Sequence, residues 1–338
     1  NILMKHEPIL EINDKKIGSN HPTYFIADIA ANHDGDIERA KDLIYLAAES
    51  GADAAKFQHF TASTIVSDIG FKSLQSKQSH QSQWKKSVFE VYADASVSLD
   101  WTESLKETCD KAKIAFFTSP YSVELVDHID PYVPAYKIGS GECNNYPLLE
   151  HIAQFGKPVI LSTGMNTIES VLKAVQIFDK ANVPLALLHT TNLYPTPPKL
   201  VRYGAMQELS EAFPNQVFGL SDHTTSNHAC FGAVALGASI LERHFTDHKK
   251  RSGPDIVCSM DENECKELIE GSNLIWQMRG GTKEPAKEEK VTIDFAFATV
   301  VAIKDIKKGE EFTKENIWVK RPGTGEILAD KYNDIIGK

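Results

Sequence analysis

The stretch KPVILSTGMNTIESVLKAVQIFDKANVPLALLHTTN, residues 157–192, decides the fold. Residues 159–162 and 185–189 are apolar runs of strand length, and polar residues follow each of them. Between these runs, apolar side chains recur three or four positions apart over 168–181, which is the spacing of one helix face. A strand, a helix and a strand in this order predict a parallel βαβ unit, because parallel strands need a crossover connection.

The same alternation extends along most of the chain. Helical patterns such as those at 37–50 and 262–278 follow further apolar runs of strand length. Successive βα units repeated in this way over about 250 residues are typical of a (β/α)8 TIM barrel of the α/β class. A doubly wound parallel sheet is the alternative. The eight predicted strands are 24–30, 53–57, 114–118, 135–138, 159–162, 185–189, 217–220 and 239–244.

Size, charge and cysteine content narrow the function classes. The chain has 338 residues, 42% of them hydrophobic, which is enough for one large core and a small extra domain. Its net charge of −10 argues against nucleic acid or an anionic membrane as the main partner. No run approaches the ~18 apolar residues of a membrane span, and the charged N-terminal residues are unlike a secretory signal. The five cysteines form no C-x-x-C pair, which indicates reduced thiols and a cytoplasmic location.

Segments outside the βα units indicate a second domain. Residues 7–18 predict a hairpin that turns at Asn13-Asp14 and covers one end of the barrel. Residues 70–86 form a polar loop of a length that is usually functional or mobile. The predicted organisation is a barrel domain with its hairpin at 1–280, a charged linker at 281–294 and a small β-rich domain at 295–338.

Polar side chains follow every predicted strand. The active site of a barrel lies at the carboxyl ends of its strands, so chemistry is expected there. Strands often end in polar residues, but lysines, histidines and carboxylates at so many ends indicate function. These strand-end residues are Asp28, Asn32 and His33; Lys56 and Gln58; Thr118 and Ser119; Lys137 and Ser140; Ser162 and Thr163; His189, Thr190 and Asn192; Ser221, Asp222 and His223; and Glu242 and His244.

Lys56 and Lys137 each follow apolar residues inside a predicted strand. A buried lysine is costly unless an anion pairs with it. One interpretation is an ion pair with a buried carboxylate, and another is a Schiff-base lysine. The third is a cradle for phosphate or carboxylate, in which Ser140, Ser162 and Ser221 supply hydroxyl donors.

His223 and His244 are predicted at the ends of neighbouring strands. Glu242 faces the same way as His244, because residues two apart share a strand face. Two imidazoles near a carboxylate can hold a divalent metal with several open positions. The residues alone leave a purely structural role for this pair open.

Several segments resemble the sialic acid synthase family, and together they cover nearly the whole chain. The most specific are PAYKIGSGECNNYP at 134–147, GLSDHT at 219–224 and LERHFTD at 241–247. The segments DFAFATVVAIKDIKKGE and WVKRPG resemble that family's C-terminal antifreeze-like domain. The other matching segments are IADIAANHDG at 26–35, GADAAKFQ at 51–58, ILSTGMN at 160–166, LLHTTNLYPTP at 187–197 and GPDIVCSM at 253–260.

The resemblance implies a barrel followed by an antifreeze-like domain, in a domain-swapped homodimer. It implies that phosphoenolpyruvate (PEP) condenses with N-acetylmannosamine (ManNAc) to give N-acetylneuraminate and phosphate, with Mn2+ or Mg2+ required. By matching motif, His223 and His244 would bind the metal. For the mechanism, we expect a carboxylate near that metal, Asp28 or Glu242, to manage protons. The PEP-binding residues would be Lys56, Lys137, Ser140, Asn192 and Ser221. The sugar-binding residues would be Gln58, Tyr194, Asp255, Phe295 and Arg321, the last two from the small domain.

The chain departs from the family pattern at two places. The family usually has Glu at the position of Asp28, and residues 70–86 do not align with the family's loop. The small domain would also be about one β-element short of the family's. Legionaminate or pseudaminate synthases, which use diacetamido-trideoxy hexoses, are the nearest alternatives. A Schiff-base aldolase acting through Lys137 or Lys56 and a sugar-binding protein on an inactive barrel are more distant ones.

Overall fold

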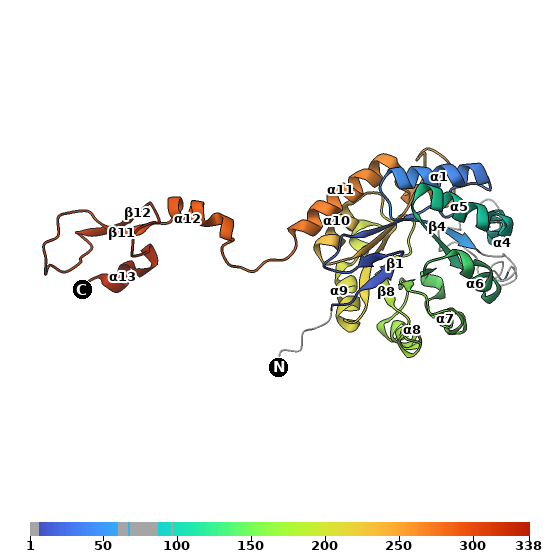
Figure 1. The fold of residues 1–338 in the computed structure, drawn as a ribbon, viewed down its shortest axis with the longest axis horizontal. Coiled ribbons are helices and arrows are strands. Elements are labelled where there is room, and N and C mark those ends of the chain that lie inside the picture. Colours follow the sequence, from blue (N-terminus) through green and yellow to red (C-terminus); the bar gives the residue numbers. More distant parts are fainter. Residues whose placement is uncertain (1–6, 60–66, 68–86, 96) are drawn as a thin grey trace. The chain divides into compact units, whose positions relative to one another are not determined.

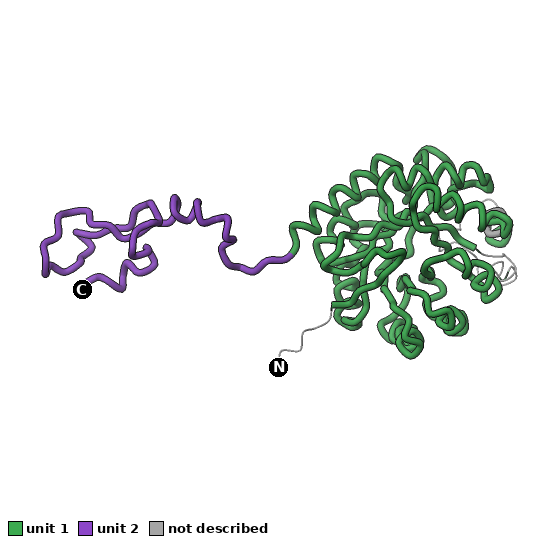
Figure 2. Tube along the Cα trace, in the orientation of Figure 1, with its two compact units in different colours: residues 1–279 green, residues 280–338 purple. Residues whose placement is uncertain are grey.

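The computed structural model describes residues 7–59, 67, 87–95 and 97–338. The chain divides into two compact units, Asn1–Arg279 and Gly280–Lys338 (Figure 2). The predicted loop at 70–86 lies outside the described residues. Among the helices in the described part of the chain, none combines the length and the apolar composition needed to cross a membrane.

The first unit is a barrel of eight parallel strands in the order β5-β4-β3-β10-β9-β8-β7-β6. The strands at the two ends of this order, β5 and β6, contact each other, so the sheet closes on itself. The predicted fold class is confirmed, and the doubly wound alternative is wrong because the strand order never reverses around a switch point. The strands are β3 Tyr24–Asp28, β4 Ala54–His59, β5 Ala115–Pro120, β6 Tyr136–Ile138, β7 Val159–Ser162, β8 Leu185–His189, β9 Val217–Asp222 and β10 Ile240–His244.

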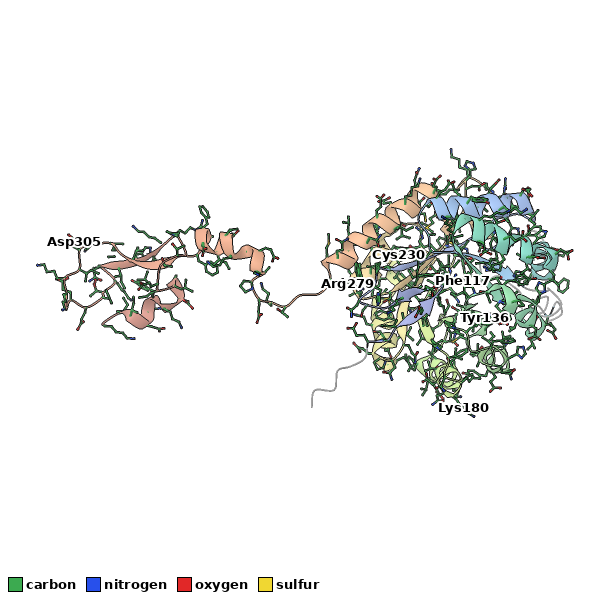
Figure 3. All side chains as sticks on the ribbon, in the orientation of Figure 1. Phe117, Tyr136, Lys180, Cys230, Arg279 and Asp305 are labelled. Atoms are coloured by element: carbon green, nitrogen blue, oxygen red, sulfur yellow. The ribbon has the colours of Figure 1, made fainter. Side chains whose placement is uncertain are left out.

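Helices surround the strands (Figure 1). Their first turns are capped by side chains where the sequence offers them: Asp36 accepts from the backbone N–H of Glu38, and Thr167 accepts from that of Ser170. In Figure 3, Lys180 at the end of α8 lies at the rim of the barrel unit. The helices are α1 Ile37–Glu49, α4 Val88–Ala95, α5 Thr102–Ala112, α6 Val123–Ile129, α7 Tyr146–Ala153, α8 Ile168–Lys180, α9 Tyr203–Ala212, α10 His228–Ala235 and α11 Glu262–Met278.

The apolar residues form two separate buried clusters. The larger one lies between strands and helices and includes Leu161, Leu241 and Phe245. The smaller one fills the barrel interior and includes Ile160 and Ile240, so consecutive residues of one strand belong to different clusters. This alternation determines which polar residues of each strand face the interior.

An N-terminal hairpin closes one end of the barrel. Strands β1 Leu10–Ile12 and β2 Lys15–Ile17 pair antiparallel. Asn13 and Asp14 turn between them with φ of 48° and 65°, the positive φ values of a two-residue type I′ hairpin turn. The apolar side chains of Leu10, Ile12 and Ile17 join the interior cluster, so the predicted hairpin is present and seals the amino-terminal ends of the barrel strands.

The second unit is small and contains one two-stranded sheet. Strands β11 Thr299–Ala302 and β12 Ile317–Lys320 pair antiparallel, as expected for a β-rich C-terminal domain. Helix α12 Lys290–Ala296 precedes the sheet and includes the last residues of the segment that the sequence predicts as a linker. Helix α13 Tyr332–Ile335 follows it.

Candidate active site

The carboxyl ends of the barrel strands bring the predicted catalytic side chains together. Because alternate residues of a strand share a face, the interior residue Ile240 is followed on the same face by Glu242 and His244. The same step from the interior cluster reaches a polar side chain on six of the other strands. These inward-facing residues are Asp28, Lys56, Gln58, Ser119, Lys137, Ser162 and Ser221.

The two predicted lysines reach one carboxylate. Lys56 Nζ lies 3.2 Å from Asp28 Oδ2 and 3.2 Å from Glu242 Oε2. Lys137 Nζ lies 3.6 Å from the same Glu242 oxygen. All four side chains are at most 5% exposed, so the charges are stable only as a group. Both lysines are therefore paired with buried carboxylates, and their role in binding an anionic substrate stays a prediction.

Two serines also form hydrogen bonds with this cluster. Lys137 Nζ donates to Ser162 Oγ at 2.9 Å, and the Ser221 hydroxyl donates to Glu242 Oε1 at 2.9 Å. Two ammonium groups and two carboxylates balance in charge when all are ionised. A bound anion could thus take the place of one of the two carboxylates beside the lysines. Because its charges balance, the cluster does not by itself attract a highly charged anion.

Burial and neighbouring charges shift the four groups differently. Burial raises the pKa of Asp28, because Lys56 and His244 compensate it only in part. Burial also acts to raise the pKa of Glu242, but Lys137 and Lys56 outweigh it and bring that pKa to about 2. For Lys56, burial lowers the pKa, yet Asp28 and Glu242 leave it raised overall. Burial dominates for Lys137 and lowers its pKa to about 8.

His223 and His244 lie next to each other, with ring centroids 5.5 Å apart. His223 Nδ1 lies 3.0 Å from the carbonyl oxygen of Thr191. Because a carbonyl only accepts hydrogen bonds, Nδ1 carries the proton and Nε2 keeps a free lone pair. Burial, with His244 nearby, lowers the pKa of His223 to about 3, so the imidazole is neutral, as a metal ligand must be.

The donors around the two histidines fit a partly coordinated divalent cation. Asp28 Oδ1 and His244 Nδ1 are buried and have no hydrogen-bond partner among the described residues. Within the part of the chain that the structure describes, no group of three or more His, Cys, Asp or Glu side chains is arranged to hold a metal. The protein would therefore supply two imidazole ligands and leave the other positions to water or substrate.

Comparison with known proteins decides the family. The NeuB family model matches residues 43–284, and the SAF domain model matches residues 297–338. The chain belongs to the NeuB family. The N,N'-diacetyllegionaminic acid synthase of Campylobacter jejuni is 38% identical over 324 residues, which are 94% of this chain and 95% of that protein. The N-acetylneuraminate-9-phosphate synthase of Homo sapiens is 32% identical over 308 residues, which are 90% of this chain and 84% of that protein.

A solved structure agrees with this assignment. The N-acetylneuraminic acid (sialic acid) synthetase of Leptospira borgpetersenii, solved with citrate, is 29% identical with a TM-score of 0.75, covering 85% of this chain and 95% of that one. The predicted family is confirmed, and this NeuB-family chain is a PEP-dependent condensing enzyme, as expected from its sequence. The named products of the relatives differ, so the comparisons leave its sugar open.

Two predicted sugar-binding residues of this NeuB-family chain lie beside the histidines. The Tyr194 ring centroid is 4.2 Å from that of His223 and 6.2 Å from that of His244. Asp255 Oδ2 lies 3.9 Å from His244 Nδ1. Gln58 is two residues beyond Lys56 on the same strand face and is half-buried.

Ser140 and Asn192 meet at Gly164. Ser140 Oγ accepts a hydrogen bond from Gly164 N at 3.0 Å, and its hydroxyl proton has no acceptor among the described residues. A Cβ atom at Gly164 would lie 2.9 Å from both Ser140 Oγ and Asn192 Oδ1. The two predicted PEP-binding side chains are thus neighbours, separated by a residue with no side chain.

Phe295 and Arg321 belong to the second unit. There the Arg321 guanidinium carbon lies 5.9 Å from the centre of the Phe295 ring, within cation–π range. Phe295 is 70% exposed, so the aromatic face and the cation form a joint surface feature.

Sequence reasoning missed one residue of this region. Glu142, in the turn after β6, has its pKa raised to about 7, mainly by burial, with Lys137 acting in the opposite direction. No sequence signal indicates burial of a glutamate in such a turn. Ser119 has a buried hydroxyl without a partner among the described residues. It is one of the predicted strand-end residues, and it lies two residues after the interior residue Phe117.

Proposed function

We propose that this enzyme condenses PEP with an N-acetylated hexose to give a nonulosonate and phosphate. The observation that supports this most is the convergence of Lys56 and Lys137 on Glu242, beside His223 and His244. Phosphate and carboxylate groups need cationic and hydroxyl donors, and a sugar aldehyde needs activation by a Lewis acid. Both kinds of group lie at the same end of the barrel.

PEP is bound by Lys56 and Lys137 together with Ser140, Asn192 and Ser221. The Ser140 oxygen accepts from Gly164, and its hydroxyl proton, which has no acceptor among the described residues, is available to PEP. The lysines share their charge with Asp28 and Glu242, so the lysine cluster alone supplies no net positive charge. A divalent cation on the histidine pair would make the site cationic as a whole, which PEP requires.

The chemistry proceeds by carbon–carbon bond formation. C3 of PEP attacks the aldehyde carbon of the open-chain sugar, and the aldehyde oxygen takes up a proton. Water adds to the electron-poor C2 and loses a proton, and phosphate leaves as the C2–O bond breaks. Bound Mn2+ or Mg2+ would supply Lewis-acid activation of the aldehyde. The lysines orient C3, and Asp28 and Glu242 are the carboxylates placed to handle protons.

ManNAc is the sugar we propose, contacted by Gln58, Tyr194, Asp255, Phe295 and Arg321. The resemblance of the segments TNLYPTP, GPDIVCSM and WVKRPG to sialic acid synthases supports this choice. A 2,4-diacetamido-trideoxy hexose is the second candidate. It is favoured by the higher identity to the legionaminic acid synthase, 38%, than to the N-acetylneuraminate-9-phosphate synthase, 32%.

We further propose that the active enzyme is a domain-swapped cytoplasmic homodimer, in which Arg321 and Phe295 of one subunit reach the sugar in the barrel of the other. The exposed Phe295 ring, packed against Arg321, is a surface suited to cover a sugar. The five cysteines, all free and buried, are consistent with a reducing compartment.

A product assay tests the proposal. Purified enzyme is incubated with PEP, Mn2+ and a panel of N-acetylated hexoses, and products are identified by mass spectrometry. We expect release of phosphate together with a nine-carbon keto acid, with the highest kcat/KM for ManNAc. A preference for a diacetamido-trideoxy hexose would change the sugar, whereas no product with any hexose would overturn the proposed reaction.

A further inference from the structure

A buried arginine lies directly behind the histidine pair, on the outer face of the barrel wall. Arg243 alternates with Glu242 and His244 along β10, so its side chain points away from the interior toward the helices. It is 1% exposed. The reaction proposed above uses no arginine at this position, yet burying a guanidinium is costly unless its surroundings compensate it.

The guanidinium of Arg243 joins segments that are distant in the sequence. Nη1 donates to Asn227 Oδ1 at 2.7 Å. Nη2 lies 3.3 Å from the carbonyl oxygen of Thr224 and 3.4 Å from that of Cys258. Arg243 therefore connects strand β10 to the loop after β9 and to the turn that follows Asp255.

Two carboxylates complete these surroundings. Asp222 Oδ2 lies 3.7 Å from Arg243 Nε, and Glu264 Oε2 lies 3.9 Å from Nη1. Asp222 is itself held by Thr224, whose hydroxyl donates to Oδ2 at 2.6 Å. Replacing a buried ion pair with apolar packing is often neutral for stability, so stability alone does not account for this arrangement.

The contacts of Arg243 fall next to the proposed metal ligands. Arg243 and Asp222 are register partners on β10 and β9. Each is the residue immediately before a histidine, His244 or His223. Thr224 is the residue immediately after His223, and the turn held through Cys258 begins at Asp255, whose carboxylate lies 3.9 Å from His244 Nδ1.

We propose that Arg243 is a positioning residue, which sets the spacing of the His223 and His244 imidazoles and holds Asp255 beside them. The inference rests on the proposed metal role of the histidine pair. The planar guanidinium offers N–H donors in a fixed fork, whereas lysine offers one flexible ammonium. The positive charge of a lysine therefore cannot replace the guanidinium of Arg243. The side chain at this position has to reach three hydrogen-bond acceptors on two different loops at once.

The test compares Arg243→Lys with Arg279→Lys. Arg279 also donates to backbone carbonyls, those of Ser19 at 2.7 Å and Val234 at 3.1 Å, but near the amino-terminal ends of the strands. Mn2+ affinity is measured by calorimetry, and the thermal midpoint is measured without metal. We expect Arg243→Lys to weaken Mn2+ binding by about 10- to 100-fold, and Arg279→Lys to leave it unchanged. A purely structural role would lower the thermal midpoint without changing Mn2+ affinity.

The outcomes separate the two proposals. A wild-type enzyme that binds no Mn2+ would overturn the proposed metal site itself. Wild-type Mn2+ affinity in a folded Arg243→Lys variant would overturn only the positioning role. If that variant does not fold, Asn227→Ala decides, because it removes the 2.7 Å acceptor and keeps the arginine. Weaker Mn2+ binding by Asn227→Ala supports the inference, and unchanged binding overturns it.

Discussion

The ammonium nitrogen of Lys56 lies 3.2 Å from Asp28 Oδ2, and both side chains are buried. Removing Lys56 therefore leaves buried carboxylates without their partner. We predict that Lys56→Ala lowers the free energy of unfolding by about 3–5 kcal/mol. It should also weaken transition-state binding with PEP by at least about 1.5–3 kcal/mol, measured as kcat/KM.

A second variant separates these two effects. Lys56→Met combined with Asp28→Asn removes the cation and one of the carboxylates that it leaves unpaired. Chemical denaturation should show that much of the stability returns, while kcat/KM for PEP stays low. Recovery of both quantities would contradict a direct role of Lys56 in binding PEP.

The buried ammonium of Lys137 predicts a pH dependence. Burial lowers its pKa to about 8, and the protonated form is the one that attracts PEP. Activity is therefore present below this pH and lost above it, with kcat/KM for PEP falling about tenfold per pH unit on the alkaline side. Lys137→Arg keeps its charge and should abolish this alkaline decrease. Covalent trapping of Lys137 by borohydride with substrate would instead support the Schiff-base alternative.

Metal removal should abolish turnover. We expect excess EDTA to stop the reaction and Mn2+ or Mg2+ to restore it, because the two proposed imidazole ligands would leave the other positions of the cation to water or substrate. His244→Ala should lower Mn2+ affinity while leaving the far-UV circular dichroism unchanged. His151→Ala is the matched control, because His151 lies away from the site. Its Nε2 is 2.7 Å from Asp127 Oδ1. Full turnover by a verified metal-free enzyme would contradict the mechanism.

Gly164 separates the side chains of the proposed PEP site. A Cβ there would lie 2.6 Å from Thr190 Cγ2 and 2.9 Å from Ser140 Oγ and Asn192 Oδ1. We predict that Gly164→Ala displaces these groups and lowers kcat/KM for PEP by roughly 10- to 100-fold, with Mn2+ affinity unchanged. Gly204→Ala is the control, because no atom lies within 4 Å of a Cβ at that position. Equal kinetics for the two variants would remove Gly164 from the site.

The proposed subunit exchange predicts complementation between two inactive variants. Arg321→Ala and His244→Ala should each be nearly inactive alone. In heterodimers, one barrel keeps both histidines and receives Arg321 from the His244→Ala subunit, so part of the activity should return. Activity is measured on heterodimers isolated with two affinity tags. If these verified heterodimers show no recovery, Arg321 does not act across the subunit boundary.

The barrel could be predicted because the apolar periodicity of its strands and helices is strong. Where the predicted strand bounds differ from the observed ones, the causes are local. Strands β7 and β8 have the predicted bounds. Strand β3 ends at Asp28, two residues earlier than predicted, and the backbone turns soon after, where Ala30 has a φ of 46°. Strand β9 continues to Asp222, beyond the apolar run, because its pairing with β10 extends to the register partners Asp222 and Arg243.

The partners of charged groups could not be predicted from the sequence. The alternation of strand faces places Lys56, Lys137 and Glu242 inside the barrel, but the convergence of both lysines on Glu242 depends on barrel closure. Glu142 gives no sign of burial in its polar turn, and its raised pKa follows from packing that only the folded chain provides. The local sequence pattern identified the positions of these charged residues. Contacts between residues distant in the sequence determine their charge states.

The hairpin of Leu10–Ile12 and Lys15–Ile17 closes the barrel at the amino-terminal ends of its strands, because the apolar side chains of the hairpin fill that end. Substrates, products and water must then enter and leave through the opposite end, at the carboxyl ends of the strands. Along β10, Glu242, which the lysines contact, lies one inward step deeper than His244. In the proposed assignment, the depth of the two subsites sets the order of binding and release. PEP binds before the sugar, and the sugar product leaves before the next PEP binds.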